Sequence, residues 1–392
     1  MDRRLIWLGA GAFITSTVAF VFSSLLHAIA DDTGVSITSA GHLITAYSLS
    51  YAIAAPLLSA LTGTLDRRSV MVGSMAVFVG GTVIAATSTG FGSLLAAQVV
   101  MGAAAALFAA TGQATAVGLV APEFRARAVS VVLAGTTLAV ALGAPVGSLI
   151  ATFWGWHGTF IALGTLGALC AVILWWKLPG DLRGTALPLA ERLSVIAHPG
   201  VANALGVTFF YIVGGFTVIS YLAPLALEGA GLSPAALPGM LLAYGFGAVV
   251  GNLSAGQLAD RIGATRVVIF AIAVSTMLSL GMAVALKVLP MHLAGPVLIG
   301  LMVPWGISGW TFPSAQADRL VALAPHLAQL TLALNASALY FGIGVGSFVG
   351  GQVLDHATPA DLGVAGAVFP LLALGLLYLS RQRRGLAATP AE

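Results

Sequence analysis

Four residues in an apolar segment near 293–316 share one helical face, and their side chains could bind a planar solute. Trp305, Gly309, Phe312 and Gln316 follow i, i+4, i+7, i+11 spacing, which aligns them along one side of an α-helix. An aromatic ring can stack on a flat molecule, and a carboxamide can donate to and accept from its polar edge. The stripe therefore predicts binding of a planar, hydrogen-bonding solute.

Other polar and aromatic side chains lie in the middle of further apolar segments. Such groups are costly in a membrane unless they face protein or a water-filled cavity. The candidate solute-binding residues are Trp305, Gln316, Asn335, Tyr340, Tyr211, Gln113, Thr17 and Tyr47. Membrane helices also use such residues to bond one another and to fill packing gaps, so a structural role is the alternative for each.

No Asp or Glu lies clearly in the middle of an apolar segment. Proton coupling would therefore use groups nearer the ends of the segments. His27, Asp31 and Asp32 lie at the end of the first segment, and His42 lies at the start of the second. Histidine changes its charge near neutral pH. These four residues are the proton-coupling candidates; for the histidines, a hydrogen bond at an interface is the alternative.

Charged residues in loops could hold one face of the protein closed. A loop carboxylate can cap a neighbouring helix and pair with arginine. The predicted conformational latch comprises Asp260, Arg261, Arg266, Arg67 and Arg68. Glu123, Arg125 and Arg127 form a second cluster, which is either equivalent or merely a solvated loop.

The sequence contains no catalytic motif typical of an enzyme. It has no HExxH, no GxSxG, no paired carboxylates within apolar segments and no His/Cys cluster with metal-ligand spacing. A Walker loop is also missing. We therefore expect neither catalysis nor a cofactor or metal, and no nucleic-acid partner.

These side chains must be positioned by helices that cross a bilayer. The 392 residues are 59% hydrophobic and 7% charged, with a mean hydropathy of +1.01, whereas soluble domains carry ~25% charged residues. A bilayer core of ~30 Å needs about 20 apolar residues per helix. We expect twelve transmembrane helices near 5–29, 39–62, 69–88, 92–120, 128–152, 158–176, 200–223, 236–258, 266–287, 293–316, 327–353 and 362–380.

The distribution of charge predicts an orientation. With both termini cytoplasmic, every Lys and Arg except Lys287 falls on the cytoplasmic side, where short loops retain basic residues. We expect a multi-pass protein of the bacterial inner membrane. The acids on the outer side are Asp31, Asp32, Glu228, Asp355 and Asp361.

The two halves of the chain repeat one another. At an offset of 197 residues, Gly34-Val35-Ser36 matches Gly231-Leu232-Ser233, and Ala46-Tyr47 matches Ala243-Tyr244. Because six is even, both six-helix halves share one orientation and can rock about a central cavity. We expect a monomeric, all-α membrane protein with two pseudo-symmetric halves. The predicted units are residues 1–176, a cytoplasmic linker 177–199, and residues 200–392.

Segment 256–263, GQLADRIG, resembles the GxLaDrxG loop signature of the major facilitator superfamily. GAPVG at 143–147 is similar to a motif of its drug:proton antiporter branch. The sequence departs from the family pattern at three places. Gly63 replaces the usual acid of the first-half signature, Gln98 stands where a buried arginine is common, and Ala19 stands where many relatives carry an acid.

Three longer stretches resemble bacterial purine base, nucleoside and sugar efflux permeases. They are VAPEFRARAVSVVLAG (120–135), WGISGWTFPSAQADRLVALAP (305–325) and LNASALYFGIGVGSFVGGQVLD (334–355). The resemblance implies secondary active efflux by alternating access, with purine bases or nucleosides exchanged for protons. A multidrug or sugar exporter, or a gradient-independent facilitator or importer, is the alternative.

Overall fold

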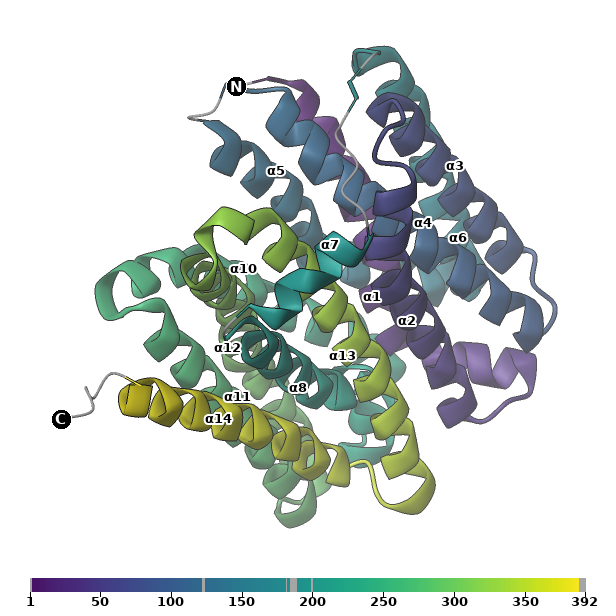
Figure 1. Ribbon diagram of the computed structural model, residues 1–392. Coiled ribbons are helices and arrows are strands. Elements are labelled where there is room, and N and C mark those ends of the chain that lie inside the picture. Colours follow the sequence, from purple (N-terminus) through teal and green to yellow (C-terminus); the bar gives the residue numbers. More distant parts are fainter. Residues whose placement is uncertain (1, 122–123, 181, 184–188, 199, 388–392) are drawn as a thin grey trace.

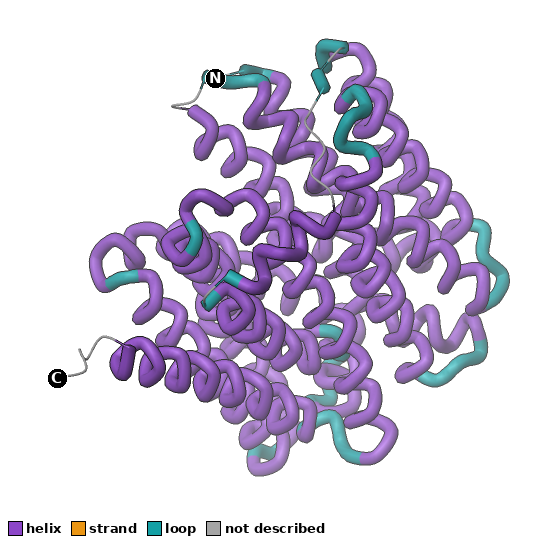
Figure 2. The backbone as a smooth tube through the Cα atoms, in the orientation of Figure 1, coloured by secondary structure: helices purple, strands orange, loops and turns teal. Residues whose placement is uncertain are grey.

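The chain is almost wholly helical in the computed structural model (Figures 1 and 2). The structure describes residues 2–121, 124–180, 182–183, 189–198 and 200–387. The helices form two groups, and α7 (Leu189–Ser194) lies on the chain between them. The expected all-α architecture is confirmed.

The first half contains six membrane crossings. Its elements are α1 (Arg4–Thr33), α2 (Ile37–Leu61), α3 (Arg67–Ala86), α4 (Phe91–Gly118), α5 (Arg125–Leu138), η2 (Ala139–Gly143) and α6 (Ala144–Lys177). Ser36 caps α2 by accepting a hydrogen bond from the Ser39 N–H at 3.1 Å. Helix α1 extends beyond its expected end, so Asp31 and Asp32 belong to its last turn.

A kink inside α6 separates two crossings that were expected as separate helices. Gly155 has φ = +69°, a left-handed conformation that glycine adopts without steric cost, and Trp154 is also non-helical. Among the described residues, eleven helical runs are apolar enough to cross a membrane. One of them, Arg127–Lys177, has 51 residues and is long enough to cross twice. The expectation of twelve crossings is therefore met.

The second half repeats this order. Its elements are α8 (Val201–Ile219), α9 (Leu222–Pro224), η4 (Leu225–Gly229), η5 (Pro234–Ala236), α10 (Leu237–Ile262), α11 (Ala264–Val288), α12 (Met291–Leu323), η6 (Pro325–Leu327), α13 (Ala328–His356) and α14 (Asp361–Ala387). The short turn η3 (Val195–Ala197) follows α7.

Equivalent glycines let equivalent helices approach closely in the two halves. A Cβ at Gly102 of α4 would lie 2.2 Å from the Tyr47 carbonyl oxygen of α2. A Cβ at Gly306 of α12 would lie 2.2 Å from the Tyr244 carbonyl oxygen of α10. Small residues at such crossings allow backbone-to-backbone packing in membranes. The repeat found in the sequence is thus a repeat of helix contacts.

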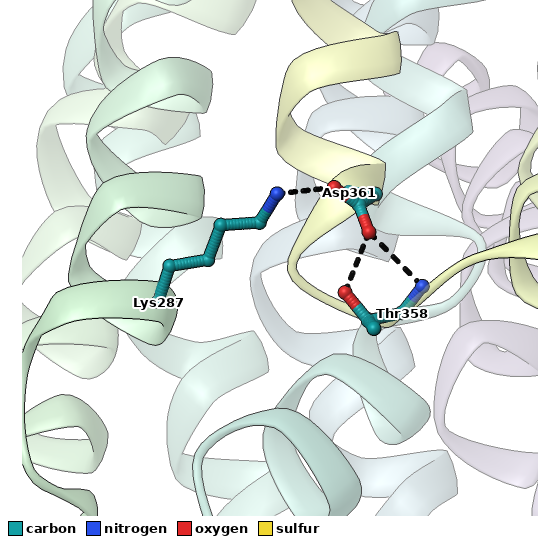
Figure 3. Close-up of polar contacts among 3 residues, drawn as sticks. All are labelled: Lys287, Thr358 and Asp361. Carbon is teal, nitrogen blue, oxygen red and sulfur yellow. Dashed lines mark hydrogen bonds and ion pairs between the residues drawn. The ribbon is translucent and has the colours of Figure 1, made fainter.

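The two ends of the bundle carry different charges. We call the end with Asp32, Glu228, Asp355 and Asp361 the acidic end, and the end with Arg67, Arg125, Arg261 and Arg319 the basic end. Lys287 is the one cation expected among the acids. Its ammonium pairs with the Asp361 carboxylate, which also accepts from the Thr358 N–H at 3.0 Å and the Thr358 hydroxyl at 2.6 Å (Figure 3). Lys287 therefore fastens the end of α11 to the start of α14.

Hydrogen bonds between the halves run from the acidic end to the middle of the bundle. On α2, the Thr38 hydroxyl donates to Asp355 at 2.7 Å, and the Thr45 hydroxyl donates to the Gly344 carbonyl at 3.1 Å. Near mid-span, Asn252 donates to the Thr137 hydroxyl at 3.2 Å. The halves are thus fastened together on the acidic side of the membrane middle.

Candidate solute site between the two halves

Three aromatic rings from both halves meet near the middle of the bundle. Phe20 on α1 lies 6.0 Å from Phe216 on α8 and 6.1 Å from Trp310 on α12, measured between ring centroids. All three rings are half-buried. Tilted aromatic neighbours at this spacing attract one another and can also stack on a flat guest. We call Phe20, Phe216 and Trp310 the aromatic cluster.

A pair of tyrosines also bridges the two halves. Tyr51 on α2 stacks on Tyr340 on α13, with centroids 3.5 Å apart and ring planes 15° apart. Tyr340 is a predicted solute-binding residue, and the structure places it at the contact between the halves. On the other flank, Ser314 of α12 donates to Asn252 at 2.8 Å, which fixes the amide that reaches Thr137.

Tyr211 and Trp305, both predicted solute-binding residues, line a cavity inside the second half. The cavity has a volume of about 40 Å³ and includes Tyr244, Ser275 and Gly309 in its wall. The Tyr211 hydroxyl bonds the Ser275 hydroxyl at 2.8 Å. A volume of this size holds about one water molecule and no purine ring. In this conformation the cavity itself cannot be the solute site.

Gln316 and Asn335 belong to a buried polar network near the basic end. The Gln316 amide donates to the Ala204 carbonyl at 2.7 Å and to the Thr208 hydroxyl at 3.1 Å. Thr208 donates to the Asn335 amide oxygen at 2.7 Å, and Arg319 donates to the Gln316 amide oxygen at 3.2 Å. The network joins α8, α12 and α13, so both predicted residues have protein partners here.

The remaining predicted solute-binding residues lie in the first half. The buried Tyr47 hydroxyl donates to the Thr15 carbonyl at 2.9 Å, which ties α2 to α1. Thr17 is buried and donates to the Phe13 carbonyl one turn earlier, at 2.8 Å. Gln113 is half-buried, and no described residue forms a hydrogen bond with its amide. Of the three, Gln113 keeps its amide available to a solute.

Sequence reasoning missed Phe20, Phe216, Trp310, Asn252 and Arg319 as site residues. The three rings are apolar side chains in apolar helices, so their types carry no signal; only the fold brings them together. Asn252 and Arg319 did carry a signal in the sequence, because a polar group inside a membrane helix is unusual. Arg319 was counted among the loop cations, yet α12 continues to Leu323 and buries it.

Two proton-coupling candidates contact the other half, and one of them meets an acid there. His27 Nε2 on α1 lies 3.1 Å from a Glu228 carboxylate oxygen in the π-helical turn η4. Asp32 instead accepts from the Trp156 indole N–H at 3.1 Å within the first half, and Asp31 is exposed. His42 stacks on Phe348 of α13, with centroids 6.1 Å apart. Of the four candidates, only His27 meets an acid of the other half among the described residues.

The predicted latch residues behave differently in the two halves. Arg67 donates to the Ala114 carbonyl at the end of α4 at 2.6 Å, and the Arg68 guanidinium lies 4.2 Å from the centre of the Trp175 ring. Asp260, Arg261 and Arg266 are exposed, and no ion pair between them is among the contacts of the described residues. In the second predicted cluster, Glu123 lies outside the described residues.

Metal ligands do not gather in the described part of the chain, which holds no group of three His, Cys, Asp or Glu side chains that could bind an ion. What the fold does define is a membrane transport protein: two repeated helical halves, polar groups within the spans, and an inter-half surface at mid-depth.

The family follows from comparison with known proteins. Residues 8–347 match the Major Facilitator Superfamily, and the chain belongs to it. It is 28% identical over 378 residues to the uncharacterized MFS-type transporter YbcL of Bacillus subtilis (strain 168), covering 96% of this chain and 95% of the relative. A second protein of that organism, the uncharacterized MFS-type transporter YtbD, is 29% identical over 360 residues, covering 90% of this chain and 88% of its own length.

Solved structures share the fold at low sequence identity. A D-xylose-proton symporter has a TM-score of 0.79 at 16% identity, with 95% of this chain and 96% of that chain covered. A bacterial homolog of the human lysosomal transporter Spinster, in an inward-facing and occupied conformation, has a TM-score of 0.70 at 17% identity, with 96% of both chains covered. Membership of the Major Facilitator Superfamily makes the protein a transporter of a small molecule across a membrane.

Proposed function

We propose that this transporter exports purine bases or nucleosides in exchange for protons. The observation that carries the proposal is the aromatic cluster, in which Phe20 of one half faces Phe216 and Trp310 of the other. A planar heterocycle inserted between these rings would contact both halves at once. Its binding energy would then depend on how the halves are oriented, as alternating access requires.

The proposed direction of transport is supported by the orientation expected from the charge at the two ends. Because short cytoplasmic loops retain Lys and Arg, the basic end, with both termini, would lie on the cytoplasmic side of a bacterial inner membrane. The contacts His27–Glu228, Thr38–Asp355 and Thr45–Gly344 lie toward the acidic end, and the Asn252–Thr137 bond lies near mid-span. This conformation would accordingly receive its solute from the cytoplasm, as an exporter does before release. The protein would act as a monomer, because each chain holds both halves.

Protons outside the cell would act on the conformation through His27 and Glu228, which lie at the acidic end. Protonation converts their hydrogen bond into an ion pair that strengthens the closed acidic end. Loss of that proton weakens the contact and favours opening. Proton occupancy and access to the outside are in this way coupled through one contact between the halves.

The test is transport by purified protein in proteoliposomes with an imposed pH gradient. Labelled adenosine, hypoxanthine, arabinose and a cationic dye are followed in parallel, with the membrane potential clamped. Gradient-dependent movement of the purines alone supports the proposal. Movement of arabinose or the dye instead would identify a sugar or multidrug exporter. Purine movement that ignores the gradient would identify a facilitator and remove the proton from the mechanism.

A further inference from the structure

Polar side chains from both halves lie one helical turn from the aromatic cluster. On α12, Ser314 lies four residues after Trp310, and on α1, Ser16 lies four residues before Phe20. Residues four apart are neighbours on the surface of a helix. Because α12 runs toward the basic end and α1 runs away from it, both serines lie on the basic side of their rings. A polar level next to the rings is thus reached from each half.

Hydrogen bonds connect the side chains at this level. Ser16 bonds the Thr136 hydroxyl of α5 at 3.2 Å, and Ser314 donates to the Asn252 amide oxygen of α10 at 2.8 Å. Asn252 in turn donates to Thr137, the residue next to Thr136, at 3.2 Å across the boundary between the halves. We call Ser16, Thr136, Thr137, Asn252 and Ser314 the polar layer.

Asn252 holds its two partners in this layer unequally. The Ser314 bond has a usual length for its type, whereas 3.2 Å is the upper limit of usual N–H···O distances, so the Thr137 bond is the weaker one. An amide has two N–H donors and an oxygen with two lone pairs, and Asn252 is only half-buried. It can therefore take another partner in place of Thr137 while Ser314 keeps the amide oriented.

The repeat shows that equivalent helices pack without this bond. At the offset of 197 residues that aligns α2 with α10, Asn252 corresponds to Ala55. At the offset of 199 residues that aligns α5 with α13, Thr137 corresponds to Ala336. Helices α2 and α13 pack extensively, although neither alanine side chain can form a hydrogen bond. An amide–hydroxyl bond is therefore not a general requirement of packing between the halves.

We propose that Asn252 reads the hydrogen-bonding edge of the transported solute, exchanging its bond to Thr137 for bonds to that edge. The inference rests on the proposed function, because it concerns the solute that stacks on the aromatic cluster. A helical turn rises about 5.4 Å, so a bicyclic ring stacked on Trp310 can extend to this amide. Asparagine pairs bidentately with the amino group and ring nitrogen of adenine. The solute class is therefore a 6-aminopurine, and Asn252 determines specificity for it.

The exchange also links recognition to conformation. The bond from Asn252 to Thr137 joins α10 to α5, so a solute that takes the amide removes one bond between the halves near mid-span. A flat solute without an amino group beside a ring nitrogen would stack on the rings and leave that bond in place. Only a solute with the matching edge would both bind and loosen the halves.

Equilibrium binding to purified full-length protein in nanodiscs tests the inference without transport. Labelled adenosine is displaced by unlabelled adenosine or by purine riboside, which has the same rings and ribose but no 6-amino group. Wild type should prefer adenosine by about fivefold or more, because purine riboside lacks one partner of the amide. Asn252→Leu should bind both about equally. Asn203→Leu, which removes an amide bonded to the Leu376 carbonyl between α8 and α14, is the matched control and should keep the preference.

Thr137→Val separates exchange from a structural role. Valine is close to threonine in size but has no hydroxyl, so the amide is freed and adenosine binding should tighten by about two- to tenfold. Unchanged or weaker binding in Thr137→Val, or a wild-type preference for adenosine in Asn252→Leu, would overturn the inference and leave the proposed function standing. Equal binding of both nucleosides by wild type would do the same. Binding of neither nucleoside by wild type would overturn the inference and the proposed function together.

Discussion

His27 and Glu228 form a polar contact between the two halves, with Nε2 of the imidazole 3.1 Å from the carboxylate oxygen. His27 lies near the end of α1, and Glu228 lies in η4, between α9 and α10. The neighbouring acids Asp31 and Asp32 follow on α1, and Asp32 is already engaged by Trp156. A change in charge at His27 would therefore act directly on this contact between the halves.

Replacing His27 by Gln should reduce the dependence of transport on external pH. Glutamine can still bond Glu228 but cannot become charged, so the proton no longer changes the strength of the contact. A partly exposed ion pair contributes about 0.2–1 kcal/mol, so the pH-dependent change in rate should shrink by up to about fivefold. The measurement is the exchange rate against external pH. His292→Gln, an exposed histidine at the same end, is the control; an identical pH profile in both variants would exclude His27 from coupling.

Replacing Gly41 by Ala should drive the acidic end open. A Cβ at this position of α2 would lie 1.9 Å from the Tyr221 hydroxyl oxygen of the other half. Overpacking of this kind costs about 1–3 kcal/mol, which shifts the equilibrium by about fivefold or more. Gly73→Ala is the control, because nothing lies within 4 Å of its Cβ.

The shift is measurable as a distance between spin labels at Thr89 and Ala357, which are exposed on different halves at the acidic end. Cys170, the single cysteine, is buried and can be replaced by alanine beforehand. Longer distances in Gly41→Ala but not in Gly73→Ala are expected. Unchanged distances would mean that the halves do not meet at Gly41 and Tyr221.

Asp66 should stabilise the first half in a pH-dependent way. Burial opposes ionisation of its carboxyl, but hydrogen bonds from Ser69 and from the Arg68 backbone outweigh burial and lower the pKa. The contribution is therefore present above the unfolded-state pKa and is lost as pH falls through the lower folded-state value, that is, below about pH 4.

Asp66→Ala should cost about 1 kcal/mol at neutral pH, because the cap of α3 is removed. Asp66→Asn keeps a cap without the titrating group and should cost much less. Thermal unfolding in detergent at neutral and acidic pH provides the comparison. A wild-type advantage over Asp66→Ala that grows toward low pH would contradict the assignment of a lowered pKa.

Gln316→Leu should destabilise the second half. The change leaves the Thr208 hydroxyl and the Arg319 guanidinium without an amide partner, at a cost of about 1–3 kcal/mol. The expected result is a lower midpoint of thermal unfolding. Gln113→Leu, where no described residue bonds the amide, should leave the midpoint nearly unchanged. Equal stability of both variants would show that the network around Gln316 contributes little to folding.

The helices were predictable from sequence because lipid imposes length, apolar composition and charge bias on each span. The repeat was predictable because Gly34-Val35-Ser36 and Ala46-Tyr47 have matches 197 residues later in the chain. The helical stripe predicted a solute-binding role for Trp305, which stays a prediction. The partners of Gln316 were not predictable, since Ala204 and Thr208 lie on another helix. Phe20 and Trp310 could not be identified as site residues either. An aromatic residue in an apolar helix looks like any other core residue in the sequence, and only the fold brings these two rings together.

The central claim is that a planar solute binds between rings contributed by both halves. The most direct measurement compares gradient-driven adenosine transport by wild type, Trp310→Ala and Trp176→Ala, the last being a largely exposed tryptophan. Loss of a stacking contact of about 1 kcal/mol should raise KM about fivefold in Trp310→Ala, with Trp176→Ala unchanged. Equal KM values in the two variants, or no gradient-driven adenosine movement by wild type, would contradict the claim.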